Sequence, residues 1–169
     1  MDFWRYLFEL LFGAWDKMCF LEKQYICVYN VLSYRTRIRC NELSDIISFI
    51  NNNLNVMSLE SIGNFIFNIS EVIDIKNEQI YGIEILVPVN KPFESTGQCV
   101  YKPIFRIENA VSRQTIGGYD NILDVESSIF SYIKRRNLSP VTGVYHVVLH
   151  NDLPLENLIS YVGTNSNIL

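Results

Sequence analysis

The chain has 169 residues, of which 49 % are hydrophobic and 19 % are charged; this balance is typical of a folded domain and excludes a disordered tail. Its net charge of -4 argues against a nucleic-acid-binding surface, because phosphate contacts require clustered Lys and Arg. The four cysteines have no CxxC spacing, so the sequence predicts free thiols in a cytoplasmic protein that has neither a metal site nor a cofactor.

The first predicted element is an amphipathic helix within residues 1–22, where the stretch FWRYLFELLFGAW covers residues 3–15. It is too short to span a bilayer and contains Arg5 and Glu9. Its apolar face must be buried, and three partners remain open: its own domain or a second copy, a groove on another protein, or a membrane surface. A translation start at Met18 would omit this segment. The candidate partner-binding residues are Phe3, Trp4, Leu7, Phe8, Leu11 and Trp15.

The next unit covers residues 23–90 and has the order strand, helix, strand, strand. Residues 25–38 are rich in Tyr, Val and Ile and predict a strand. Apolar residues recur at helical spacing over residues 41–54. Residues 64–73 and 79–89 predict a hairpin, because turn-forming residues separate two β-branched runs.

A linker at residues 91–103 precedes a second unit at residues 104–169, which repeats this order. The segment Asn30–Ser33 aligns with Asn109–Ser112. Between the strand and the helix of this unit, the stretch TIGGYDNI carries two glycines. We interpret them as a turn and not as an anion-binding loop, because Asp120 stands where such loops carry Lys. The sequence therefore predicts an α+β fold of two tandem β-α-β-β repeats, preceded by the apolar helix.

Several stretches resemble the gyrase-inhibitor-like superfamily: GGYDNI leading into a helix, NLSPVTGVYHVV, and YGIEILVPVN at the end of the first unit. This resemblance covers about residues 25–164, and it implies a central cleft between the repeats that binds ligands. The stretches YNVLSYR, VPVNKPF, RIENAVSRQTIGGYDNI and TGVYHVVL are most similar to a group of Firmicute proteins found beside type VII secretion toxins. That similarity implies an accessory factor or chaperone for a secreted toxin.

In the multidrug-sensing members of this superfamily, an acidic residue and aromatic rings in the cleft bind cations. Glu84 is the acidic candidate here, because it alternates with Ile83 and Ile85 and so points to the opposite face. The alternative is that Glu84 faces water and that the aromatic residues only pack in the core. The candidate ligand-binding residues are Glu84, Tyr119, Tyr145, Phe65 and Tyr81.

The first functional hypothesis is a non-catalytic binding protein that serves a type VII secretion toxin or substrate. A second is a protein that binds a cationic aromatic effector, and the resemblance leaves open a third, catalysis by Glu84 and Tyr119. A catalytic Cys–His pair is also open, since such partners meet only in space. His146 and His150 share a face of a predicted strand, but nearby ligands are too few for a metal site. We expect a protein partner or a homodimer through residues 1–22, no nucleic acid and no membrane span.

Overall fold

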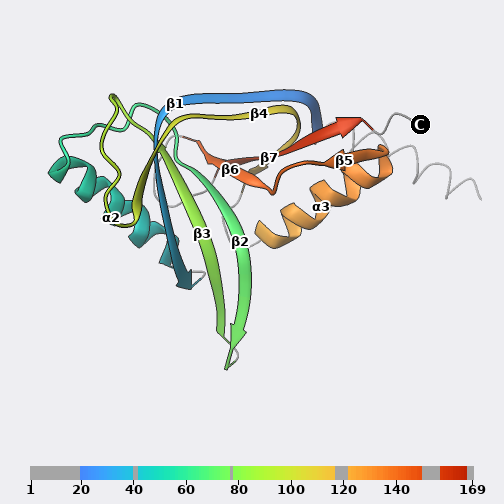
Figure 1. The fold of residues 1–169 in the computed structure, drawn as a ribbon. Helices are drawn as coiled ribbons and strands as arrows, with labels where there is room; N and C mark the ends of the chain where they lie inside the picture. The colour runs from blue at the N-terminus through green and yellow to red at the C-terminus, as the bar shows by residue number, and fades with distance from the viewer. Residues whose placement is uncertain (1–19, 40–41, 77, 117–121, 150–156, 167–169) are drawn as a thin grey trace, which may run out of the picture.

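A computed structural model of the chain describes residues 20–39, 42–76, 78–116, 122–149 and 157–166 (Figure 1). Within them the fold is α+β: strands form one antiparallel sheet, and two helices pack against it. The element bounds are β1 Phe20–Arg39, α2 Leu43–Val56, β2 Ile66–Ile75, β3 Glu78–Pro88, β4 Cys99–Ile116, α3 Ile122–Arg135, β5 Leu138–Pro140, β6 Tyr145–Val148 and β7 Asn157–Ser166.

The strands of this sheet close on themselves. The order is β4-β1-β3-β2-β6-β7-β5, and β4 also pairs with β7, so hydrogen bonding runs from β4 through β1, β3, β2, β6 and β7 back to β4. We call this closed path the strand circuit. The predicted hairpin is present as β2 and β3, which pair from Ile66 with Leu86 to Ile75 with Glu78. The joint between β2 and β6 consists of two residue pairs, Ile66 with Val147 and Phe67 with His146.

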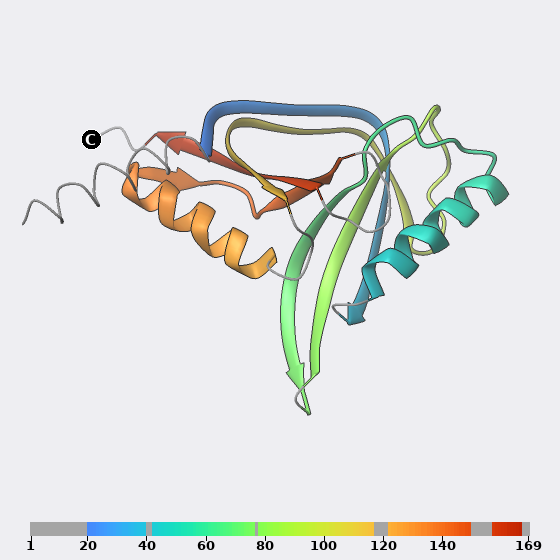
Figure 2. The same cartoon turned by 180° about the vertical axis from the view of Figure 1, so that it is seen from behind.

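The two longest strands, β1 and β4, each serve two partners. Residues 20–34 of β1 pair with β4, and residues 31–39 pair with β3. Residues 99–113 of β4 pair with β1, and residues 110–116 pair with β7. In both views β1 and β4 run side by side across one edge of the molecule before β1 turns to run beside β3 (Figure 1, Figure 2).

Two strand starts differ from the sequence prediction. β1 begins at Phe20, inside the range 1–22 that the sequence assigned to the N-terminal helix, and β4 begins at Cys99, inside the linker 91–103. The reason is mutual pairing, because Phe20 opposes Arg113 and Tyr34 opposes Cys99. Hydrogen bonds to a distant strand thus extend each strand beyond its local β-branched pattern.

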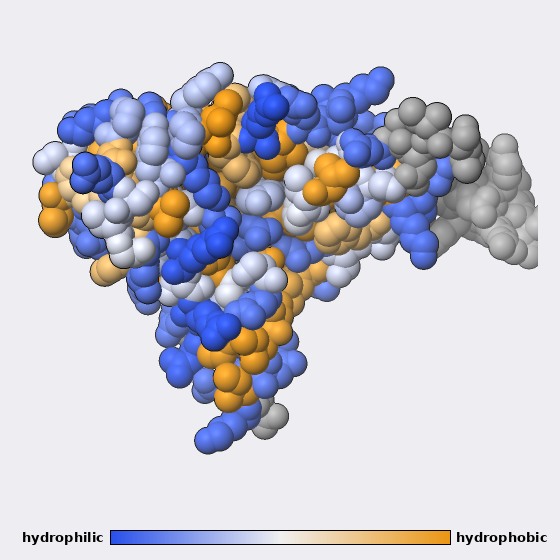
Figure 3. Space-filling view, viewed as in Figure 1, coloured by the Kyte–Doolittle hydropathy of each residue, from blue (hydrophilic) through white to orange (hydrophobic). Residues whose placement is uncertain are grey.

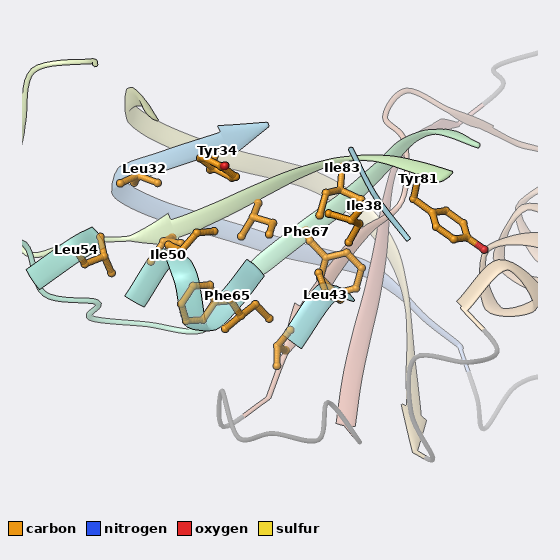
Figure 4. Close-up of a cluster of buried hydrophobic side chains, with 14 of the residues drawn as sticks. Leu32, Tyr34, Ile38, Leu43, Ile50, Leu54, Phe65, Phe67, Tyr81 and Ile83 are labelled. Carbon is orange, nitrogen blue, oxygen red and sulfur yellow. The ribbon is translucent and has the colours of Figure 1, made fainter. Parts of the chain in front are cut away.

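The helices lie on opposite sides of the β2–β3 hairpin, and each covers its own core (Figure 1, Figure 2). Burial of one large aliphatic or aromatic side chain in such a core stabilises the fold by about 1.5–3 kcal/mol. α2 buries Leu43, Ile47, Ile50 and Leu54 against β1, β2 and β3 (Figure 4). The second core, beneath α3, contains Val125, Ile129, Tyr132 and Ile133 with Phe20, Val111 and Val162.

A third, smaller cluster lies on the sheet face that α2 does not cover. It is formed by Val31, Ile66 and Leu86, with Phe105, Tyr145 and Val147 packed against it. The hairpin itself extends beyond these cores: hydrophobic residues reach the surface near its tip, where Val72 and Ile75 are exposed (Figure 3). Among the described residues, no helix is long and apolar enough to cross a membrane.

Candidate functional site

Alternation along β3 decides which side chains share a face of the sheet. Tyr81, Ile83 and Ile85 belong to the core under α2, whereas Leu86 belongs to the cluster on the opposite face. Because successive side chains of a strand point to opposite faces, Glu84 lies with Leu86 and away from α2. The fold therefore places a carboxylate on the uncovered face of the sheet.

A depression of about 730 Å³ opens on this face beside Glu84. We call it the Glu84 depression. Pockets that bind small molecules typically have volumes of about 300–1,000 Å³, and the volume of this depression lies within that range. It is lined by Arg35, Thr36, Arg37, Asn68, Ser70, Glu71, Gly82, Ile83, Glu84, Gln98 and Tyr145.

Glu84 is only 7 % exposed and is held by three donors. Ser33 Oγ donates to Glu84 Oε1 at 2.6 Å, Lys102 Nζ at 2.7 Å and Arg35 Nε at 3.1 Å. Burial alone raises the pKa of Glu84, but the hydrogen bonds from Lys102 and Ser33 outweigh it and hold the pKa below its ordinary value of 4.5. Glu84 is therefore an ionised carboxylate at neutral pH.

A second ion pair lies beside the first and joins β1 to β2 across β3. Arg37 Nη2 lies 2.7 Å from Glu71 Oε1. The Glu71 side chain crosses β3 at Gly82, where an added Cβ would stand only 2.5 Å from Glu71 Cγ. A glycine is thus needed at position 82 for Glu71 to reach Arg37.

Tyr145 contributes an aromatic ring to the Glu84 depression. Its ring centroid lies 4.9 Å from that of Phe105, so one side of the ring is packed. Burial, and then the charge of Glu84, raise the pKa of Tyr145, and its phenol is therefore neutral at physiological pH. Next to it, Asn68 Nδ2 donates to Val144 O at 2.7 Å and fixes the start of β6 against β2.

The five predicted ligand-binding residues do not all meet. Glu84 and Tyr145 line the same depression. Phe65 and Tyr81 are 2 % and 3 % exposed and lie in the core under α2, so they do not line this depression. Alternation explains the separation of Tyr81 from Glu84: the two are an odd number of residues apart on the same strand, so Tyr81 points to the other face. Tyr119 lies outside the described residues.

The candidate partner-binding residues Phe3, Trp4, Leu7, Phe8, Leu11 and Trp15 also lie outside the described residues. Conversely, the sequence prediction missed Arg35, Asn68 and Lys102. Arg35 and Asn68 oppose Glu84 on the neighbouring strands β1 and β2. The one available signal was charge, since cross-strand neighbours favour opposite charges, but this signal is usable only when the register is known.

A buried polar group links β6 and β7 to α3. His146 is fully buried; its Nδ1 lies 2.8 Å from Ser160 Oγ and its Nε2 lies 2.9 Å from Glu126 Oε1. The residue types match a hydrolytic triad, but Ser160 is 1 % exposed, so no substrate reaches its hydroxyl. We interpret this group as a structural link.

In the part of the chain that the structure describes, no three His, Cys, Asp or Glu gather as metal ligands.

The sequence matches no protein-family model and no curated protein. Solved structures share the fold. EcmrR in the cryo-EM structure of an EcmrR–DNA complex in EcmrR-RPo is 13 % identical with a TM-score of 0.67; the match covers 96 % of this chain and 64 % of that chain, so this chain spans less than two thirds of EcmrR. The crystal structure of the EcmrR C-terminal domain is also 13 % identical, with a TM-score of 0.59. This match covers 87 % of this chain and 98 % of that chain.

A hydrolase from Listeria innocua is 10 % identical, with a TM-score of 0.45 over 85 % of this chain and 92 % of that one, too distant to support an argument. The two EcmrR matches establish that the chain has the fold of the EcmrR C-terminal domain. At 13 % identity, that likeness concerns the fold alone. None of these proteins is named for type VII secretion, so that part of the sequence resemblance stays a prediction.

Proposed function

We propose that this chain is a non-catalytic binding domain that holds a small aromatic cation in the Glu84 depression. The observation that carries the proposal is Glu84 itself, an ionised carboxylate buried beside the ring of Tyr145. A buried charge is costly unless it is paired, and a carboxylate beside an aromatic ring suits a cationic partner.

Glu84 already pairs with one such group, which comes from outside the lining of the depression. The ammonium of Lys102 lies 2.7 Å from Glu84 Oε1, and we expect the positive centre of a bound ligand to lie at a similar distance from this carboxylate. Because Lys102 is supplied by a flexible stem from β4, the position it occupies is accessible to other cations of similar chemistry. An aromatic substituent on that cation would contact Tyr145.

The fold supports the same interpretation. The superfamily that the sequence resembles uses this kind of fold to bind ligands in a cleft between two repeats. We infer that the two halves of this chain are such repeats: Asn30 and Asn109, which align in sequence, both have φ 50° and both stand where a long strand takes up its second partner. The DNA contact of EcmrR is not part of the proposal.

The type VII secretion hypothesis is retained only as a sequence prediction, because its candidate residues lie within residues 3–15, outside the described residues. Copurification with one toxin from the native host would support it, and recovery as a tight homodimer burying Trp4 and Trp15 would count against it. The described geometry favours ligand binding at Glu84, and the proposed localisation remains cytoplasmic.

Isothermal titration calorimetry with two ions of the same shape tests the proposal. Tetraphenylphosphonium and tetraphenylborate differ in the sign of their charge, so we expect the protein to bind the first and not the second. Glu84→Gln should weaken tetraphenylphosphonium binding by about tenfold or more, because a hydrogen-bonded charge is worth about 1.5–3 kcal/mol and 1.4 kcal/mol is tenfold.

Glu78→Gln is the matched control. Glu78 lies on the same strand and pairs with an arginine, Arg39, at 3.1 Å, but it does not line the depression. This variant should bind tetraphenylphosphonium as the wild type does. Equal binding of both ions, or no binding of the cation, would rule out the proposed function.

A further inference from the structure

The three hydrogen bonds of Glu84 described above all reach one oxygen, Oε1, and they come from two different strands. Ser33 and Arg35 lie on β1, directly beside Glu84 in the sheet. Lys102 lies on β4, on the far side of β1, where it opposes Val31. Its side chain therefore crosses the face of β1 to reach the carboxylate.

From this geometry we propose that Lys102 is a built-in competitor of the ligand: its ammonium occupies the ligand's cationic position and leaves when the ligand binds. The inference rests on the proposed function and adds the group that sets the affinity. It also explains how a buried carboxylate stays paired when the depression is empty, since an unpaired buried charge is strongly destabilising.

Lys102 is the closest charged partner of Glu84, and the other two donors differ from it. Ser33 is 2 % exposed and belongs to the strand itself, so its hydroxyl stays with the carboxylate. Arg35 bonds through Nε at the longer distance of 3.1 Å, and its side chain is 75 % exposed, so it is held more weakly than Lys102 and already lies mostly in water. Lys102 has a compact charge on four rotatable carbons, and its side chain is 31 % exposed, so a small rotation moves the ammonium into water.

Exchange of one cation for another keeps the charge of the site constant. The carboxylate has Lys102 before binding and the ligand cation afterwards, so no step leaves Glu84 with fewer positive partners than it has now. The released ammonium regains its water shell. The measured affinity is then lowered by the free energy needed to release Lys102, and removal of the competitor must increase it.

The test is tetraphenylphosphonium binding by Lys102→Met, which keeps an unbranched stem and removes the charge. We expect binding about tenfold tighter than in the wild type. Lys91→Met is the matched control: it makes the same change in net charge at an exposed position after β3 and should leave affinity within about twofold of wild type.

The double variant Glu84→Gln/Lys102→Met separates competition from a simple gain of apolar contact. In the Glu84→Gln background, Lys102→Met should bring no further tightening, because the shared carboxylate is absent. Unchanged or weaker binding by Lys102→Met, or a gain that persists in the double variant, would overturn the inference while leaving the proposed function intact. Failure of every variant to bind the cation would instead reject the proposed function, and this inference with it.

Discussion

Glu84 shows how one buried carboxylate is kept charged by its neighbours. Burial favours the neutral acid, whereas Lys102, Ser33 and Arg35 favour the ion, and the donors prevail. Such an arrangement contributes less to stability than the donors' number suggests, because desolvation offsets most of the attraction. Variants that remove one partner destabilise the fold, because they leave the opposite charges without compensation.

Glu84→Gln should therefore lower the free energy of unfolding by about 1–3 kcal/mol at neutral pH, since Lys102 and Arg35 lose a charged acceptor. The folded pKa of Glu84 lies below 4.5, so this contribution is fully present above the unfolded pKa and is lost as the pH falls through the folded pKa. Urea unfolding at pH values from 7 to 3 should show the difference between wild type and variant shrinking below about pH 4.5. A difference that is constant over this range would contradict the assigned ion pairs.

At the same scale, the sequence revealed the direction of Glu84 but not its surroundings. Alternation within one strand is a local property, so Ile83, Glu84 and Ile85 are assigned to faces from sequence alone. The same rule, applied to Tyr81, would have excluded it from the site. Arg35 and Lys102 reach Glu84 only through the register between β1, β3 and β4, which no local pattern specifies.

At the scale of elements, β1 and β4 each contain an asparagine with an unusual backbone conformation, at the corresponding place in each strand. Asn30 and Asn109 have φ 50°, a left-handed conformation that Asn tolerates better than other residues with a side chain. At Asn30 the backbone carbonyl accepts a hydrogen bond from Val89 N, and at Asn109 it accepts one from Thr164 Oγ1. Each of these two positions lies directly before the residue at which its long strand takes up a second partner, Val31 in β1 and Ala110 in β4.

Asn109→Ala should lower the free energy of unfolding by about 1 kcal/mol, because a left-handed conformation costs an L-residue about 1–2 kcal/mol. Asn109→Gly should be neutral or slightly stabilising, since glycine adopts this conformation freely. Asn30→Ala should cost more than Asn109→Ala, because Asn30 Oδ1 also accepts the hydroxyl of Tyr101 at 2.7 Å. Chemical denaturation of the three variants measures this order, and equal stability of the Ala and Gly variants at 109 would refute it.

The helices and the β2–β3 hairpin were predictable to within about two or three residues, because their apolar periodicity is local. β5 was not. Its three residues, Leu138 to Pro140, have no strand pattern of their own and are extended because they pair with Thr164 to Ser166 of β7. Its proline is tolerated because β5 lies at the end of the strand order.

At the scale of the whole molecule, the strand circuit has one short joint, and the Glu84 depression lies next to it. β2 and β6 pair over two residue pairs, supported by the hydrogen bond from Val148 N to Phe65 O at 2.9 Å. Asn68 and Tyr145, which both line the depression, come from the two sides of this joint. A ligand bound as proposed in the depression would therefore contact both halves of the chain.

Asn68→Ala removes the side-chain hydrogen bond to Val144 O that reinforces this joint. A hydrogen bond of this kind contributes about 1 kcal/mol, so the Val148 amide should exchange with solvent about fivefold faster in the variant, through local opening of β6 from β2. The amide of Ile107, within the long pairing of β1 with β4, serves as the control and should be unaffected. Hydrogen exchange followed by NMR measures both rates. Equal acceleration at both amides would show that the circuit opens as one unit, and an unchanged Val148 rate would show that the short joint does not depend on Asn68.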